Sequence, residues 1–298
     1  MRKILLALLF VAPYIAANEP TALQHIINGK HRSAEHKQRD QYRHPEQTLA
    51  FFDVKDTMTV VEISPGKEGW YTEILAPYLR DKGKLYAAHF SPGSDNPFFK
   101  SSLDAFLDKI HKHPKLYDKV EITVLDPPKE VQIAPNNSAD RVLTFRNVHN
   151  WMKNDQAPAV FNAMFKALKP GGILGIVEHR GSILKPQDPK AVSGYVTEDY
   201  VIALARKAGF EFLAKSEINA NPKDTKNYPE GVWTLPPTLK LKEEDKDKYL
   251  AIGESDRMTI KFIKPQPKTI ASFLPKALFT DVERASLADI PAVIHNSK

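Results

Sequence analysis

A repeated alternation between short, β-branched apolar segments and longer amphipathic segments constrains this 298-residue chain more than any other feature. Strands separated by helices of this length predict a largely parallel sheet with helices on both faces. Strands are expected at 57–63, 84–90, 120–125, 141–145, 173–177, 210–218 and 258–263. Helices are expected at 70–79, 97–111 and 157–168, with a further helix capped by Thr197 and ended by Gly209.

The last two expected strands are not separated by a convincing helical pattern, so they should pair antiparallel as a C-terminal hairpin. The segment between them, 219–256, is rich in Lys, Asp and Pro and is expected to be an insertion of surface loops, like the tail at 265–298. Polar helical segments at 18–56 should form an N-terminal helical cover. The resulting α/β domain spans 57–264, a Rossmann-like arrangement with a seven-stranded, mostly parallel sheet.

Residues 1–17 have the pattern of a secretory signal peptide. Arg2 and Lys3 precede an apolar run at 4–11, and small residues lead to a cleavage site after Ala17. The apolar run is shorter than the roughly 20 residues that a spanning helix needs. We therefore expect export, a periplasmic location and no stable membrane anchor after cleavage.

The composition excludes several classes of site. The chain has no cysteine, which excludes disulfides, thiolate metal ligands and cysteine nucleophiles. The formal net charge of +6 is dispersed, and removal of Arg2 and Lys3 lowers it further, so no nucleic-acid partner is expected. The sequence has no HExxH, P-loop or GxSxG motif, and no metal site is expected.

The turn after the first strand contains most of the functional signal. A tight glycine-containing turn from a strand into a helix is how Rossmann-like sheets hold nucleotides, and Gly66 and Gly69 occupy such a turn. Ser64, Gly66 and Gly69 also fit a dinucleotide fingerprint whose first glycine is replaced. Glu62 opposes that interpretation, because a carboxylate on a buried strand needs a cationic or donor partner.

Together Glu62, Ser64, Gly66 and Gly69 resemble the first motif of class I S-adenosylmethionine-dependent methyltransferases. The segment LKPGGILGIVEH at 168–179 is similar to the region leading through the fifth strand of that superfamily, and the C-terminal hairpin is its hallmark. RDQYRHPEQTLAFF, WYTEILAPYL and LTFRNVHNW further resemble a group of exported predicted methyltransferases. The resemblance implies S-adenosylmethionine as the cofactor.

The resemblance also implies positions for cofactor contacts. Glu62 would meet the amino group of the methionine moiety, His89 stands where an acidic residue usually binds ribose hydroxyls, and Asp126 matches the position that meets the adenine amino group. Arg146 and Asn147 follow the fourth strand, where open α/β sheets bind ligands, and are expected to join this site.

Candidate catalytic residues follow strands four and five. Methyl transfer requires orientation of the acceptor and in some cases removal of a proton. His149 is the preferred general base, and Glu178 and His179 are further candidates. Pairing of Glu178 with Arg146 or Arg43 is a structural alternative for that carboxylate.

The sequence leaves three functions open. The first is a methyltransferase acting on a small molecule or an envelope component. The second is a non-catalytic exported module that binds a ligand on a methyltransferase fold, favoured by Lys67, Glu68 and His89. The third is a dinucleotide oxidoreductase, which Glu62 and the hairpin oppose.

Overall fold

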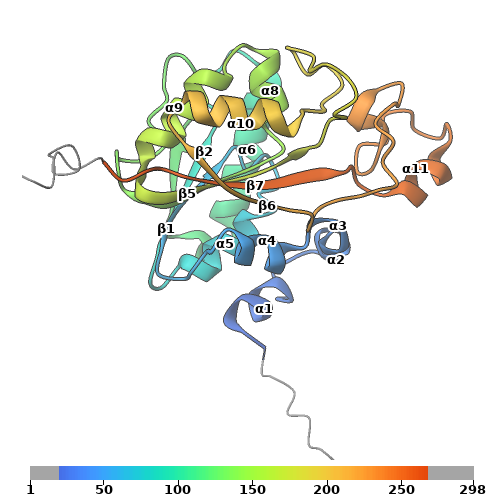
Figure 1. The fold of residues 1–298 in the computed structure, drawn as a ribbon. Coiled ribbons are helices and arrows are strands. Elements are labelled where there is room, and N and C mark those ends of the chain that lie inside the picture. The colour runs from blue at the N-terminus through green and yellow to red at the C-terminus, as the bar shows by residue number, and fades with distance from the viewer. Residues whose placement is uncertain (1–19, 268–298) are drawn as a thin grey trace, which may run out of the picture.

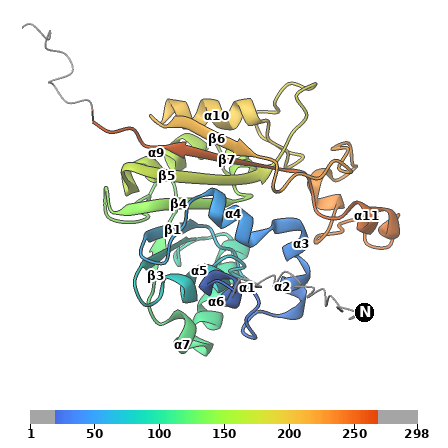
Figure 2. The ribbon, with the colours of Figure 1, turned by 60° about the horizontal axis from the view of Figure 1, so that its bottom comes forward.

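Seven strands form one sheet in the order β3-β2-β1-β4-β5-β7-β6 in the computed structural model, which describes residues 20–267 (Figures 1 and 2). The strands are β1 (Thr59–Ile63), β2 (Lys84–His89), β3 (Val120–Val124), β4 (Ala139–Phe145), β5 (Leu168–His179), β6 (Glu211–Ser216) and β7 (Arg257–Ile263). All seven coincide with the segments expected from the sequence, which confirms the fold class. The expected signal peptide, 1–17, and most of the tail at 265–298 lie outside the described residues.

The first five strands run parallel, and β7 is antiparallel to both of its neighbours. Strand β1 pairs with β2 on one side and β4 on the other, with Glu62 beside Ala87 and Leu143. Strand β7 lies between β5 and β6, so the expected antiparallel hairpin is confirmed. This order brings the carboxyl ends of β1, β2, β4 and β5 to one edge of the sheet, where ligands bind in open α/β folds.

Helices cover both faces of the sheet, as the alternation predicts. One core combines side chains of α8 (Val148–Lys153), α9 (Ala157–Ala167) and α10 (Glu198–Lys207) with Val61 and Ile63 of β1. The opposite core combines α4 (Pro45–Phe51), α5 (Thr72–Leu79) and α6 (Pro97–Lys112) with Val60. Figure 1 shows α8, α9 and α10 above the strands and α4 and α5 below them. Because side chains alternate along a strand, Glu62 belongs to the α5 side with Val60.

Several short helices have no counterpart among the expected elements. They are α1 (Ala22–Ile27), α7 (Pro114–Tyr117), α8 and α11 (Lys246–Ile252), while the cover also contains α2 (Ala34–Gln38) and α3 (Asp40–Arg43). Helices of one or two turns give too few apolar repeats to be recognised by periodicity. Thr197 is the N-cap of α10 as expected, but its side chain makes no capping hydrogen bond.

The expectation that 219–256 consists of surface loops was wrong in part. The side chain of Asn219 is buried and donates through Nδ2 to Thr48 Oγ1 at 3.0 Å and Thr259 Oγ1 at 2.9 Å. Leu235 and Glu254 are also buried, and Figure 2 shows this segment, with α11, at the end of the sheet. Some polar residues of the 219–256 segment make buried hydrogen bonds, which its composition alone does not predict. None of the described helices is long and apolar enough to cross a membrane.

Candidate active site

Two adjoining cavities open at the carboxyl ends of the parallel strands. The smaller, of about 170 Å³, is lined by Glu62, Gly66 and Arg146, among others. The larger, of about 710 Å³, is lined by residues that include Asp126 and His149. Ser64 and Asn147 line both, so the two form one continuous site.

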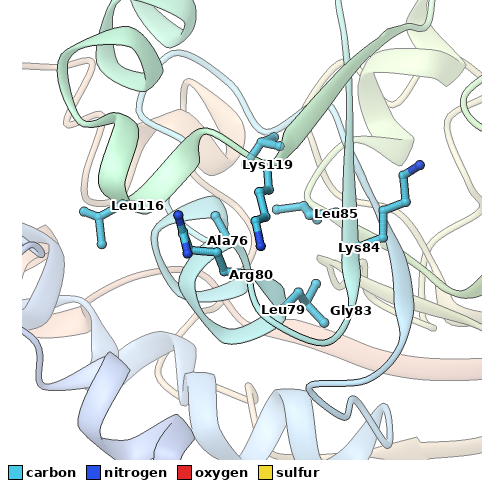
Figure 3. A pocket seen from close by; sticks show the side chains of 9 residues that line it. Ala76, Leu79, Arg80, Gly83, Lys84, Leu85, Leu116 and Lys119 are labelled. Atoms are coloured by element: carbon cyan, nitrogen blue, oxygen red, sulfur yellow. The ribbon is translucent and has the colours of Figure 1, made fainter.

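A hollow at the opposite end of the sheet has a different character. It lies beside Gly83 and Lys84 at the start of β2 and has a volume of about 10 Å³ (Figure 3). That is room for about one water molecule. We therefore place the candidate site at the carboxyl end.

The turn between β1 and α5 leaves the smaller cavity open. Ser64, Gly66 and Gly69 have φ angles of 48°, 71° and 51°, in the left-handed region that favours glycine. A Cβ added at Gly66 would meet no atom within 4 Å, so the backbone there faces open space. Lys67 and Glu68 do not fill it, because they are 67% and 58% exposed and pair with each other at 3.5 Å.

Gly69 has a packing role and lines neither cavity, contrary to its expected cofactor contact. A Cβ there would stand 2.7 Å from Phe106 Cε2 and 3.0 Å from Thr72 Oγ1. The missing side chain thus lets the first turn of α5 approach α6.

Glu62 is a buried carboxyl group without an ion-pair partner among the described residues. Its side chain accepts a hydrogen bond at 2.6 Å from Thr72 Oγ1, and only 2% of the residue is exposed. Burial raises the pKa of Glu62 to about 7, and the hydrogen bond from Thr72 opposes that shift. The carboxyl lines the smaller cavity and is not neutralised by an arginine, so it is available to a cationic ligand.

His89 does not take the place expected for it. It is fully buried, lines neither cavity, and its Nδ1 accepts from the Phe90 backbone N–H at 2.8 Å. Its Nε2 lies 3.4 Å from the Gly66 carbonyl oxygen, to which it donates. Burial lowers the pKa of His89 to about 4, so the ring is neutral. With both nitrogens engaged by backbone, His89 is a support for the turn and not a ribose ligand.

The larger cavity has aromatic and polar walls. Phe90 and Phe99 stack with centroids 4.1 Å apart on one side, and Trp233 from the 219–256 segment lines another. Asp126 lines this cavity as expected, after the third strand. Asn147 is held by bonds from Nδ2 to Ile63 O at 3.0 Å and Thr144 Oγ1 at 3.1 Å. A flat heterocycle with polar edges fits such a surface.

His149 and Glu178 form a hydrogen-bonded dyad beside the larger cavity. His149 Nδ1 lies 3.0 Å from Glu178 Oε1, and backbone N–H groups of Val148, His149 and His179 donate to the same carboxylate at 2.6, 3.3 and 2.7 Å. A carboxylate that receives four bonds only accepts, so His149 donates through Nδ1. Its Nε2 has no hydrogen-bond partner among residues 20–267 and is left to accept a proton.

The arginine pairing considered for Glu178 is wrong. Neither Arg146 nor Arg43 contacts this carboxylate, which is fully buried and satisfied by His149 and main-chain donors. Glu178 does not line either cavity, so it acts through His149 as a positioning residue.

His179 also lies behind the cavity wall. Its Nδ1 is 2.5 Å from Ser255 Oγ, and its ring centroid is 5.3 Å from that of His149. Burial, with a smaller effect from His149, holds the pKa of His179 well below its usual range. The ligand atoms of His149, Glu178 and His179 lie within 4.8 Å of one another, a spacing at which metal ions bind. The four hydrogen bonds already made to Glu178 account for this arrangement.

Several site residues were missed by sequence reasoning. Trp70 and Tyr71 line the smaller cavity, where Tyr71 stacks on Phe145 with centroids 3.5 Å apart. Their place directly after the glycine turn was the available signal. Nothing in the sequence pointed to Thr72 as the partner of Glu62.

The fold and this edge of the sheet define the class: a Rossmann-like fold of the S-adenosylmethionine-dependent methyltransferase type. A methyltransferase of this kind from Aquifex aeolicus aligns with a TM-score of 0.51 at 17% identity, over 76% of this chain and 92% of that one. The [4+2]-cyclase SpnF aligns with a TM-score of 0.50 at 15% identity, over 80% and 86%. At such low identities the structural likeness shows a shared fold and nothing further. No family model and no curated protein matches the sequence.

Proposed function

We propose that this protein is an S-adenosylmethionine-dependent methyltransferase acting on a small molecule or an envelope component. The observation that carries the proposal is Glu62, a buried carboxyl that has no ion pair within residues 20–267 and lines a cavity beside the open Gly66 turn. S-adenosylmethionine supplies a methyl group on a sulfonium and also an α-ammonium group, the kind of cation that Glu62 lacks. A buried carboxylate without a counter-charge is unfavourable, so a bound cationic ligand would stabilise the ionised form of Glu62.

The remaining residues divide between cofactor and acceptor. Ser64, Gly66 and Asn147 would hold the cofactor with Glu62, and Asp126 would contact its nucleoside part from the larger cavity. The aromatic wall excludes water, which strengthens electrostatic interactions inside the site. His149, oriented by Glu178, would take a proton from the acceptor as the methyl group is transferred.

We also propose that the protein is exported to the periplasm, as one of the exported methyltransferase-like proteins it resembles. Arg2 and Lys3 before the apolar run at 4–11 support this. An exported enzyme needs a supply of a charged cofactor made in the cytoplasm, so the location and the activity are tested separately.

A second candidate is an exported module that binds a ligand without methylating it. The bond from Thr72 to Glu62 favours it, because that carboxyl already has one donor. The fold similarity to a protein named as a cyclase is a further reason to test chemistry directly, since one fold serves unrelated reactions.

Calorimetric titration of residues 18–298 with S-adenosylmethionine and S-adenosylhomocysteine tests the proposal. We expect both to bind, and Glu62→Gln to weaken binding by about tenfold or more through loss of a charge-assisted hydrogen bond. Glu68→Gln is the matched control, because Glu68 is exposed and should leave affinity unchanged. Absence of binding by both compounds would reject the enzyme, and binding without turnover over an acceptor panel would favour the second candidate.

A further inference from the structure

Three guanidinium groups pair with a single carboxylate, and a fourth arginine near them, Arg146, lines the smaller cavity. Glu254 pairs with Arg39 at 2.5 Å, with Arg43 at 3.3 Å and with Arg257. Arg146 lies in the same electrostatic neighbourhood, because Arg257, Glu254 and Arg39 each influence its pKa. One negative charge therefore faces four positive charges.

Two of these arginines are buried, and one nitrogen atom of each has no hydrogen-bond acceptor among the described residues. Arg43 and Arg257 are 3% and 2% exposed, yet Arg43 Nη1 and Arg257 Nε have no hydrogen-bond acceptor in the described residues. Burying charge without a partner costs several kcal/mol per ion. Burial, followed by repulsion from Arg257, lowers the pKa of Arg146 to about 10. The ligand-free protein thus keeps this cluster at a cost to its own stability.

Arg146 connects the cluster to the site. It lines the smaller cavity with Glu62 and Asn147, and its guanidinium makes no hydrogen bond or ion pair within residues 20–267. Its charge also influences the pKa values of Tyr71 and His179. The wall of the smaller cavity therefore contains a guanidinium group that has no counter-ion among the described residues.

The cofactor alone does not balance this charge. S-adenosylmethionine carries a sulfonium, an ammonium and one carboxylate, and so brings a net positive charge. Its carboxylate neutralises at most one guanidinium. The remaining surplus favours an acceptor that is itself an anion.

Resting on the proposed function, we propose that the methyl acceptor carries a carboxylate or phosphate group that pairs with Arg146. The planar guanidinium fork matches both groups in a bidentate manner.

The test compares each acidic probe with a neutral analogue that lacks the anionic group. The pairs are 4-hydroxybenzoate with 4-hydroxybenzamide, and phenyl phosphate with phenol. Binding to residues 18–298 is measured by calorimetry at pH 7.5, with and without saturating S-adenosylhomocysteine. In the saturated protein, the carboxylate of S-adenosylhomocysteine occupies the position of the cofactor carboxylate. An acidic probe that still binds must therefore use a separate anion site, that of the acceptor. Variants are Arg146→Met, Arg146→Lys and the control Lys67→Met, which removes an exposed charge near the turn.

We expect at least one acid to bind the saturated protein about tenfold or more tightly than its neutral partner, as a charge-assisted bond predicts. Arg146→Met should abolish that preference, Arg146→Lys should keep part of it, and Lys67→Met should keep all of it. The thermal midpoint of ligand-free Arg146→Met should equal or exceed that of the wild type, because repulsion is relieved.

Equal binding of both charged and neutral partners, or acid binding that saturation removes, would overturn the proposal. A lower midpoint for Arg146→Met would also overturn it by making Arg146 a structural residue. If S-adenosylhomocysteine itself does not bind, the methyltransferase assignment fails. In that case, binding of the probes to the ligand-free protein still tests whether an anion site exists at Arg146. A preference for the acid that is lost in Arg146→Met supports the anion site, and equal binding of acid and neutral probe rejects it.

Discussion

His149 donates through Nδ1 to Oε1 of Glu178 at 3.0 Å, and the same carboxylate accepts backbone N–H groups at the start of α8. The bond fixes the tautomer of the ring, and Nε2 has no hydrogen-bond partner in the part of the chain that the structure describes. Because His149 lines the larger cavity, its hydrogen bond to Glu178 orients the ring as a general base for a ligand bound there.

Substitution His149→Gln should reduce turnover of an acid acceptor by about 10²–10⁴-fold, the usual contribution of a positioned base. Binding of S-adenosylhomocysteine should change by less than about threefold. Formation of that product over a pH series measures the first, and calorimetry measures the second. His111→Gln, at an exposed helix position, is the control. Equal loss of binding and turnover would make His149 a structural or cofactor-contacting residue.

Substitution Glu178→Gln should destabilise the fold by about 3 kcal/mol. The amide nitrogen would face N–H donors that the carboxylate now satisfies, in a site with no exposure. Urea unfolding measures the change, with the exposed Glu211→Gln as the reference. A stability equal to wild type would show that these hydrogen bonds are not formed.

The pKa of about 7 at Glu62 predicts a pH-dependent stability. The folded protein holds this proton more tightly than the unfolded chain, whose value is near 4.5. Stability contributed by the protonated group is therefore full below pH 4.5 and declines as the pH rises to about 7, by about 3 kcal/mol in total. Glu62→Gln should remove this decline and be more stable than wild type above pH 7, in urea unfolding at several pH values.

The same carboxyl predicts how cofactor affinity depends on pH. An ammonium group requires the ionised form, so the affinity for S-adenosylhomocysteine should rise by up to about tenfold per pH unit below pH 7. It should level off above pH 7 and weaken at higher pH, where the ligand's own amino group loses its proton. Calorimetry on Glu62→Gln should give a flat profile below pH 7. A wild-type profile that is equally flat would separate Glu62 from the ammonium.

The two glycines of the turn should respond differently to alanine. Gly66→Ala meets no atom within 4 Å and should cost only about 1 kcal/mol, the strain of a positive φ. Gly69→Ala collides with Phe106 and Thr72 and should cost more than about 2 kcal/mol. Urea unfolding compares them. Equal costs would contradict the packing role assigned to Gly69.

Sequence reasoning was most successful where a local pattern has a single structural outcome. All seven strands, the antiparallel hairpin and the turn at Gly66 were expected and found. It was least successful where a side chain's partner comes from a distant segment. His89 looked like a ribose ligand, but its neighbours are the Gly66 carbonyl and the Phe90 amide. The pairing of Glu178 with His149 and not with an arginine was equally invisible.

The sequence by itself determined the alternation of strands and helices and the placing of Glu62 and Gly66 at one strand end, because period and turn chemistry are local properties. Only the tertiary structure decided that Glu62 has no ion pair in the described part of the chain and that Gly69 serves packing. It also brings Arg43 and Arg257 to Glu254, close enough for Arg257 and Glu254 to influence the pKa of Arg146. Those arginines come from the N-terminal cover, from the turn after β4 and from β7. Their mutual repulsion, and the anion it calls for, exist only when the sheet brings the three together.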